Sequence, residues 1–209
     1  MERIKEGVQR FRTYIFPHMR GMFGRLSEGQ EPHALMITCS DSRVVPNLIT
    51  DTAPGELFIE RNPGNMVPIF GKSAMGGVSA SIEYAVGVLN VPNIIVCGHS
   101  DCGAVKGMMH PKKVSNLTAV KDWLGHGPSN EEVAGIEDPH ERLRVLTELN
   151  VLMQVENLKT HPSVAARLKK KKIGLYGWVF DIECGEVRAW NEKAGKFEVW
   201  PPESKKKRK

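Results

Sequence analysis

Short apolar runs that alternate with a helical pattern constrain the fold of this 209-residue chain more than any other feature. Residues 34–38 (ALMIT), 56–62 (ELFIERN) and 93–99 (NIIVCGH) each follow a turn signal that contains Pro or Gly, which is typical of strands. Between the second and third runs, residues 73–89 carry apolar side chains at helical spacing. This order predicts an α/β fold with a mostly parallel central sheet and helices on both faces.

The N-terminal segment has helical periodicity with one interruption. Apolar residues from Ile4 to Ile15 recur at helical spacing. Pro17 is expected to break this pattern before it resumes. We therefore predict two amphipathic helices that form an N-terminal helical arm over residues 1–30.

The C-terminal half predicts a long helix and then a hairpin. Asp138 as N-cap and Pro139 at the first helical position are typical of a helix start. Residues 172–182 have the pattern of a strand, and the turn ECGE leads from it into residues 187–190. This pair predicts an antiparallel edge strand on the sheet.

Length and charge indicate the domain organisation. A chain of this size favours one domain, which we place at residues 31–204, between the arm and a basic tail at residues 205–209. The lysine run 169–172 and the tail hold nine of the 29 basic residues, so the other 20 face 24 acidic ones. The net charge of +5 therefore comes from these two segments, which argues against a nucleic-acid partner.

Neither a membrane span nor a signal peptide is evident in the sequence, because no long apolar stretch occurs and the first residues are charged. The four cysteines, Cys39, Cys97, Cys102 and Cys184, are too few for a disulfide framework. We expect a cytoplasmic protein with no membrane partner, whose cysteines bind a metal or are buried.

Metal-ligating residue types follow two of the predicted strands. Cys39 comes directly after the first strand, His99 ends the third, and Cys102 lies three residues further on, where a new helix is expected. Ligands of parallel sheets bind at the carboxyl ends of the strands, where the strand order reverses. If the two strands are neighbours, they bring together two thiols and an imidazole, a complete protein ligand set for a zinc ion with a fourth position open to water. A thiol at a helix N-terminus, such as Cys102, is also expected to lose its proton more readily.

The other cysteines and histidines lack this context. Cys97 lies on an apolar strand and is expected to be an inert core residue, and Cys184 lies in a hairpin turn. The remaining histidines, which have no ligand spacing and are expected at the surface, are His18, His33, His110, His126, His140 and His161.

A carboxylate and a guanidinium follow the first thiol in the segment ITCSDSR. Asp41 can accept a hydrogen bond from zinc-bound hydroxide, or it can take the fourth metal position itself. Arg43 can hold the carboxylate of Asp41 in place through charge-assisted hydrogen bonds and keep it ionised. Taken alone, the two residues could be a turn cap and a surface ion pair. Beside Cys39 and the His-x-x-Cys element, they favour a role at the metal.

The two segments CSDSR (residues 39–43) and GHSDCG (residues 98–103) together resemble the β-class carbonic anhydrases. The likeness extends to PGELFIERNPGNMV, SIEYAVGVL, NVLMQVENL and LYGWVFDI. The resemblance implies a zinc enzyme that reversibly hydrates CO2 to bicarbonate and a proton. It also implies a homodimer or a higher even oligomer, with N-terminal helices that embrace the partner.

The resemblance assigns roles to the residues of these segments. It implies that Cys39, His99 and Cys102 hold the zinc ion and that Asp41 and Arg43 act as a catalytic dyad. Four substrate contacts are implied as well, by Gln30, by Phe58, by Tyr84 from across the dimer interface, and by the backbone N–H of Gly103.

The chain departs from the pattern of many relatives at two places. Pro63 and Gly64 stand in RNPGN where many relatives carry RNxAN, and they are expected to stiffen or reshape one pocket wall. Some relatives bind a regulatory bicarbonate with a Trp, an Arg and a Tyr, after which the Asp closes onto the zinc. Met36, Arg61 and Phe180 stand at these positions here, so only the Arg is matched. This indicates an open site without that regulation.

Two other functions use the same site chemistry. Hydrolysis of COS or CS2 behind a narrower apolar access is the alternative enzymatic activity. A zinc-binding anion sensor or scaffold without turnover is a non-enzymatic alternative, and the Asp41–Arg43 pair beside an open metal position disfavours it.

Overall fold

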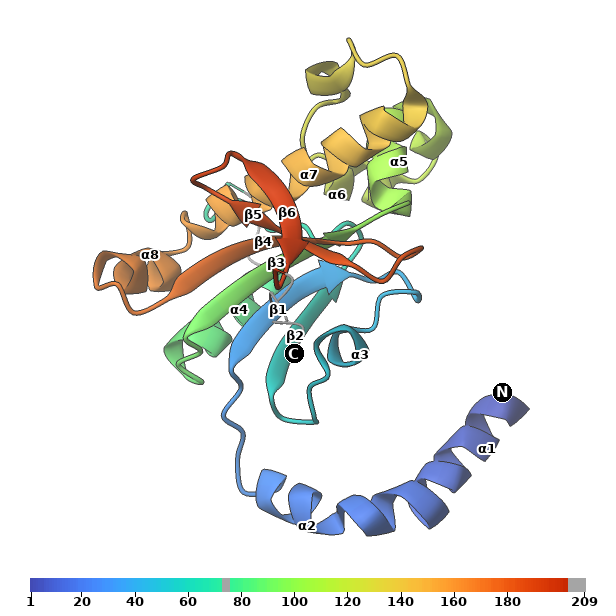
Figure 1. Ribbon diagram of the computed structural model, residues 1–209, viewed down its shortest axis with the longest axis vertical. Coiled ribbons are helices and arrows are strands. Elements are labelled where there is room, and N and C mark those ends of the chain that lie inside the picture. The colour runs from blue at the N-terminus through green and yellow to red at the C-terminus, as the bar shows by residue number, and fades with distance from the viewer. Residues whose placement is uncertain (73–75, 203–209) are drawn as a thin grey trace, which may run out of the picture. The chain divides into compact units, whose positions relative to one another are not determined.

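The computed structural model describes residues 1–72 and 76–202 (Figure 1). The predicted basic tail at residues 205–209 and the start of the predicted helix at residues 73–75 lie outside the described residues. The chain divides into two compact units, Met1–Glu31 and Pro32–Lys209.

The first unit is helical over most of its length. It contains α1 (Glu2–Arg10), a π-helical segment (Phe11–Ile15) and α2 (Phe16–Leu26). The two predicted helices are present, and the interruption between them is the π-helical segment, which ends two residues before Pro17. Pro17 itself lies in the first turn of α2, where a missing backbone N–H is tolerated. No residue of these three helical segments is buried within the chain.

A six-stranded sheet in the order β2-β1-β3-β4-β5-β6 forms the centre of the second unit. The first four strands of this order are parallel, and the β4–β5 and β5–β6 pairs are antiparallel. This confirms the predicted mostly parallel sheet with an antiparallel edge, although β6 was not predicted. The strands are β1 (Ala34–Cys39), β2 (Leu57–Asn62), β3 (Asn93–His99), β4 (Gly174–Phe180), β5 (Val187–Asn191) and β6 (Lys196–Trp200).

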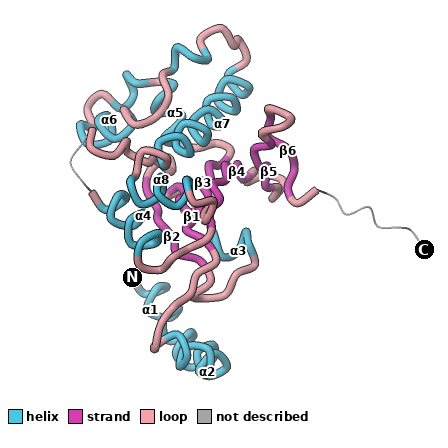
Figure 2. The backbone as a smooth tube through the Cα atoms, turned by 90° about the vertical axis from the view of Figure 1, so that its left-hand side faces the viewer, coloured by secondary structure: helices cyan, strands magenta, loops and turns pink. Residues whose placement is uncertain are grey.

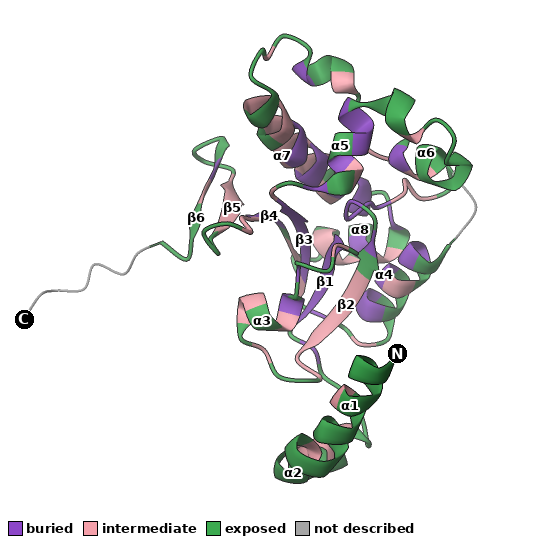
Figure 3. Ribbon diagram, turned by 90° about the vertical axis from the view of Figure 1, so that its right-hand side faces the viewer, coloured by how far each residue is buried: buried purple, intermediate pink, exposed green. Residues whose placement is uncertain are grey.

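Helices cover the two faces of the sheet unequally. Helices α4, α7 and α8 pack on one face, and the short α3 lies on the other (Figures 2 and 3). Among the described residues, no helix combines the length and apolar character needed to cross a membrane. The helices of this unit are α3 (Pro46–Thr50), α4 (Gly77–Gly87), α5 (Gly103–Met109), α6 (Thr118–Leu124), α7 (Pro139–Leu158) and α8 (Pro162–Lys169), with short 3₁₀ turns at Pro111–Val114 and Asn130–Val133.

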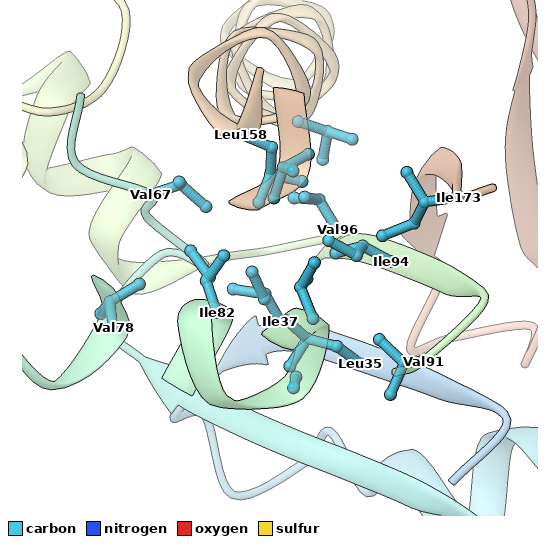
Figure 4. Close-up of a cluster of buried hydrophobic side chains, with 14 of the residues drawn as sticks. Leu35, Ile37, Val67, Val78, Ile82, Val91, Ile94, Val96, Leu158 and Ile173 are labelled. Atoms are coloured by element: carbon cyan, nitrogen blue, oxygen red, sulfur yellow. The ribbon is translucent and has the colours of Figure 1, made fainter. Parts of the chain in front are cut away.

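The main core lies between the sheet and the helices of its more covered face. Leu35 and Ile37 of β1 and Ile94 and Val96 of β3 point toward α4 and α7, and all four are fully buried (Figure 4). The intervening strand residues form a second apolar cluster on the opposite face, which includes Met36, Ile95, Cys97 and Trp178. Burial on both faces explains why these parallel strands are continuous apolar runs in the sequence.

Two glycines allow α7 to lie close to the strands that lead into the site. A Cβ atom at Gly98 of β3 would lie 2.7 Å from Val151 of α7, and one at Gly177 of β4 would lie 2.9 Å from the same side chain. Both distances are too short for a real carbon–carbon contact. The absence of side chains at these positions therefore fixes how closely α7 covers the end of β3.

Candidate metal centre

Cys39, His99 and Cys102 meet at the carboxyl ends of two neighbouring strands. Cys39 is the last residue of β1, His99 is the last residue of β3, and Cys102 occupies the N-cap position of α5. From β1 the chain first adds β2 on one side and then β3 on the other, so the strand order reverses between β1 and β3. The sequence placed a ligand site at this position for the same reason.

The donor atoms of these three residues have the spacing of metal ligands. The Sγ atoms of Cys39 and Cys102 lie 3.9 Å apart, and all three donor atoms lie within 4.8 Å of one another. Two sulfurs bound to one tetrahedral zinc ion, each at about 2.3 Å, would lie about 3.8 Å apart. All three side chains are buried, which suits a metal held by the protein.

The imidazole of His99 is oriented with one nitrogen free to bind a metal. Its Nδ1 lies 2.8 Å from the carbonyl oxygen of Ser100. A carbonyl only accepts, so Nδ1 carries the proton and Nε2 keeps its lone pair. Nε2 is buried and has no hydrogen-bond partner among the described residues. A buried nitrogen lone pair beside two thiols fits a metal ion bound at this site.

The two thiols influence each other's ionisation. The pKa of Cys39 is lowered, chiefly because the Cys102 thiol hydrogen-bonds to it. The pKa of Cys102 is raised, chiefly by its hydrogen bond with Cys39 and then by burial. The expected ionisation of Cys102 at a helix N-terminus is therefore opposed by the neighbouring thiol of Cys39. The neighbouring thiol outweighs the backbone N–H groups of Ala104 and Val105, which act in the expected direction.

Gly64 forms one wall of the centre. Its backbone N–H points to Sγ of Cys39 at 3.4 Å, and its carbonyl accepts a hydrogen bond of 3.0 Å from Asn150 of α7. The φ angle of Gly64 is +77°, and a Cβ atom there would lie 2.9 Å from Ala104 and from Met66. The positive φ and the close neighbours favour glycine at this position, and the expected reshaping of the wall by RNPGN stays a prediction.

Asp41 and Arg43 form a bidentate ion pair beside the three ligating residues. Nε of Arg43 donates to Oδ1 of Asp41 at 3.0 Å, and Nη2 donates to Oδ2 at 2.7 Å. These bonds hold the pKa of Asp41 well below its usual range and raise that of Arg43. Oδ2 of Asp41 also lies 3.9 Å from Nε2 of His99. The carboxylate is thus ionised and adjacent to the site.

Three further charged residues interact with this pair directly or through one another, and the sequence did not predict these interactions. Arg61 of β2 donates to the carbonyl oxygens of Cys39, at 3.0 Å, and Asp41, at 2.7 Å. Asp101 accepts a hydrogen bond of 3.0 Å from Nη1 of Arg43, and Lys106 of α5 forms an ion pair with Asp101. Asp101 lies inside the GHSDCG segment, but only the tertiary structure reveals its partner.

Within one chain, the residues expected to contact substrate do not all lie beside the candidate metal centre. Gly103, the first residue of α5, directly follows Cys102. Phe58 and Tyr84 pack on each other with ring centroids 5.9 Å apart. Phe58 pairs with Leu35, whereas Cys39 pairs with Asn62. The aromatic pair is thus four positions from the ligands, about 13 Å at about 3.3 Å per strand residue.

Gln30 belongs to the first unit, Met1–Glu31, so its expected contact with substrate stays a prediction. The remaining thiols are separate from the centre. Cys97 is fully buried, which raises its pKa to about 12, and Cys184 is exposed.

One histidine differs from its expected environment. His161 is 2% exposed rather than on the surface. It donates from Nε2 to the carbonyl oxygen of Pro68 at 3.0 Å and packs against Phe70. The proximity of these residues depends on a contact across 93 positions, which local sequence patterns do not predict.

Fold and site together define an α/β protein with a Cys-His-Cys metal centre at the strand-order reversal of a parallel sheet, beside an Asp–Arg pair. A family model described as carbonic anhydrase matches residues 34–187. The chain therefore belongs to the β-carbonic anhydrase family, and the carbonic anhydrase activity expected from its sequence is confirmed.

Several named proteins are similar in sequence to this chain over most of their length. The chain is 44% identical over 193 residues to a carbonic anhydrase of Synechococcus elongatus, and the aligned region covers 90% of this chain and 70% of that protein. It is 45% identical over 203 residues to a carbonic anhydrase of Pseudomonas aeruginosa, covering 94% and 90%. The solved structure of the β-carbonic anhydrase CcaA has a TM-score of 0.90 at 40% identity, covering 95% of this chain and 98% of that one. A tetrameric β-carbonic anhydrase of Sordaria macrospora has a TM-score of 0.75 at 29% identity, covering 91% and 96%.

Proposed function

We propose that this carbonic anhydrase is zinc-dependent, with Cys39, His99 and Cys102 as the zinc ligands. One observation carries the proposal: the buried Nε2 of His99 has no partner among the described residues and shares a site with two thiols that lie 3.9 Å apart. Two sulfurs and an imidazole nitrogen are a ligand set that suits zinc, and three protein ligands leave a position open for catalysis.

The proposed reaction is the reversible hydration of CO2 to bicarbonate and a proton. A zinc ion held by Cys39, His99 and Cys102 would supply a hydroxide nucleophile near neutral pH, because such an ion lowers the pKa of water from about 15.7 toward roughly 7. Asp41 would accept a hydrogen bond from the hydroxyl group of this nucleophile and so orient it. Its ionisation supports this role, because an ionised carboxylate can only accept. Arg43 keeps Asp41 ionised and fixes its orientation through two hydrogen bonds.

Substrate binding is proposed for Gln30, Phe58, Tyr84 and the backbone N–H of Gly103. Phe58 and Tyr84 contact each other about 13 Å along the sheet from the metal ligands of their own chain, at about 3.3 Å per strand residue. This separation supports their reaching a metal centre on a second copy of the chain. We therefore propose a homodimer or a higher even oligomer in which each copy completes its partner's substrate pocket.

We also propose the domain boundaries and the location in the cell. Residues 1–30 form the arm and residues 31–204 the catalytic domain, followed by the basic tail. A cytoplasmic location is supported by the cysteines outside the candidate metal site, since Cys97 and Cys184 are free thiols. Free thiols persist in a reducing compartment.

Stopped-flow CO2 hydration, combined with elemental analysis of the same sample, tests this proposal. We expect one zinc ion per chain, loss of hydration after removal of zinc by a chelator, and recovery when zinc is returned. Assays on COS run beside those on CO2 control for the substrate. Bound zinc without CO2 turnover, or faster turnover of COS than of CO2, would contradict the proposed reaction.

A further inference from the structure

We propose that Asp101 and Lys106 are positioning residues that hold the guanidinium of Arg43 in the orientation that fixes Asp41 beside the metal centre. The proposal rests on the function proposed above. Nη1 of Arg43 donates to Oδ2 of Asp101 at 3.0 Å, and Nη2 donates to the backbone carbonyl of Asp101 at 3.3 Å. Lys106 forms an ion pair with the other carboxylate oxygen, Oδ1.

The Asp41–Arg43 pair is formed within one turn, so its own contacts do not fix it relative to the rest of the site. They are two positions apart, and the side chain of Arg43 is 44% exposed. An exposed ion pair on its own holds a long side chain only weakly. Asp101 is 58 positions away, between His99, which ends β3, and Cys102, which precedes α5. Its bonds to Arg43 therefore tie the turn that follows Cys39 to the segment between His99 and Cys102.

The backbone of Asp101 adopts a conformation that directs two acceptors at Arg43. Its φ angle is +60°, in the left-handed region that few residues other than Gly, Asn and Asp adopt readily. In this conformation its carbonyl oxygen and its carboxylate both face the guanidinium. Unusual backbone geometry of this kind is found where a local contact is part of the function.

Lys106 completes the arrangement from a regular helix. It lies within α5 (Gly103–Met109), so its backbone is fixed by helical hydrogen bonds. Each carboxylate oxygen of Asp101 then faces one cation, and the charges of Asp41, Arg43, Asp101 and Lys106 alternate in sign. Such a network orients its members better than separate pairs do. Both new residues act through Arg43 rather than on substrate.

The test uses full-length enzyme variants. Asp101→Asn removes the charge but keeps the size of the side chain and a residue type that tolerates the left-handed backbone. Lys106→Met removes the second cation, and Lys106→Arg restores a cation at the same place. Lys159→Met is the matched control, because it breaks an exposed lysine ion pair with Glu156 outside the site.

We expect Asp101→Asn and Lys106→Met to keep their zinc and their KM for CO2 while kcat falls about ten-fold, the lower end for groups that orient a metal site. Lys106→Arg should recover most of the loss, and Lys159→Met should equal the wild type. Crystal structures provide a readout independent of activity. In the first two variants, we expect Arg43 to leave its bidentate contact with Asp41 or to occupy several rotamers.

Each possible result has a defined meaning. Unchanged kcat in both Asp101→Asn and Lys106→Met would overturn the positioning role, and so would loss of zinc or an unmoved Arg43 in the crystal structures. If Asp101→Asn fails to fold, the kcat values and crystal structures of Lys106→Met and Lys106→Arg test the positioning role. A wild-type enzyme without CO2 hydration would defeat the proposed function instead, while the crystal structures would still report whether Asp101 and Lys106 hold Arg43.

Discussion

The Sγ atoms of Cys39 and Cys102 lie 3.9 Å apart although 63 positions separate the two residues in the chain. The thiols meet because β1 and β3 are neighbours in the sheet and both end at the same edge. His99 adds a buried nitrogen, Nε2, whose lone pair is free because the proton of the ring lies on Nδ1. The three donors therefore converge through the main fold rather than through a flexible loop.

Removing any one ligand should release zinc. Cys39→Ser, His99→Ala and Cys102→Ser each delete one of only three protein ligands, so we expect most or all of the metal to be lost. Elemental analysis of the purified variants measures this. Cys184→Ser is the matched control, since that thiol is exposed and lies outside the metal-ligating group. Full zinc occupancy in all three ligand variants would refute the assignment.

Substitution of the dyad should separate chemistry from metal binding. Asp41→Ala and Arg43→Ala leave all three ligands in place, so we expect normal zinc content with CO2 hydration slower by about 10- to 100-fold. Stopped-flow assays on metal-analysed samples measure both quantities. Arg144→Ala, which breaks an ion pair with Glu141 on α7, serves as the control and should hydrate CO2 normally. Wild-type rates in both dyad variants would show that the pair has no catalytic role.

Bicarbonate should not shut the enzyme off cooperatively. Met36 and Phe180 belong to one apolar cluster and offer no side-chain hydrogen-bond donor, while Arg61 already donates to the carbonyls of Cys39 and Asp41. A buried anion without enough donors is costly. We expect hyperbolic inhibition by bicarbonate, and a crystal structure near neutral pH with Asp41 still paired to Arg43. Sigmoidal inhibition, or Asp41 bound directly to zinc, would contradict this prediction.

Gly64→Ala should destabilise the protein and weaken zinc binding. Alanine in the left-handed region costs about 1–2 kcal/mol, and its Cβ would also press on Ala104 and Met66 at 2.9 Å. Gly71→Ala is the matched control, because Gly71 has a φ of +78° but no atom within 4 Å of the added Cβ. Urea unfolding and zinc titration should show a larger loss at position 64. Equal losses in the two variants would mean that the close contact relaxes freely.

His161 should make stability depend on pH. Burial lowers the pKa of its imidazole below the usual value of about 6.5. The unfolded chain then binds a proton at higher pH than the folded one, so the free energy of unfolding falls as pH falls below about 6.5. Urea unfolding of the wild type and of His161→Gln from neutral to mildly acidic pH measures this. The variant should be the less sensitive of the two, and parallel curves would refute the prediction.

Local sequence patterns were sufficient for five of the six strands, but not for β6, and for the three residues that the structure brings together at the candidate metal centre. The apolar runs at residues 34–38 and 93–99 predicted β1 and β3 nearly to the residue, since parallel strands buried on both faces are continuous apolar runs. The cap at Asp138 likewise predicted the start of α7, and its side chain accepts a hydrogen bond from the N–H of His140. These features depend on neighbours within a few positions, which a single sequence displays.

The sequence by itself therefore determined which residue types stand at the ends of the strands and which chemistry they can support. Only the tertiary structure decided that Arg43 reaches Asp101 across 58 positions, that Gly64 points its N–H at Cys39, and that His161 is buried against Pro68. The physical reason is that periodicity and capping are local. Contacts between distant residues follow from the order of the strands and from how closely α7 packs over Gly98 and Gly177, which are fixed only when the whole core is assembled.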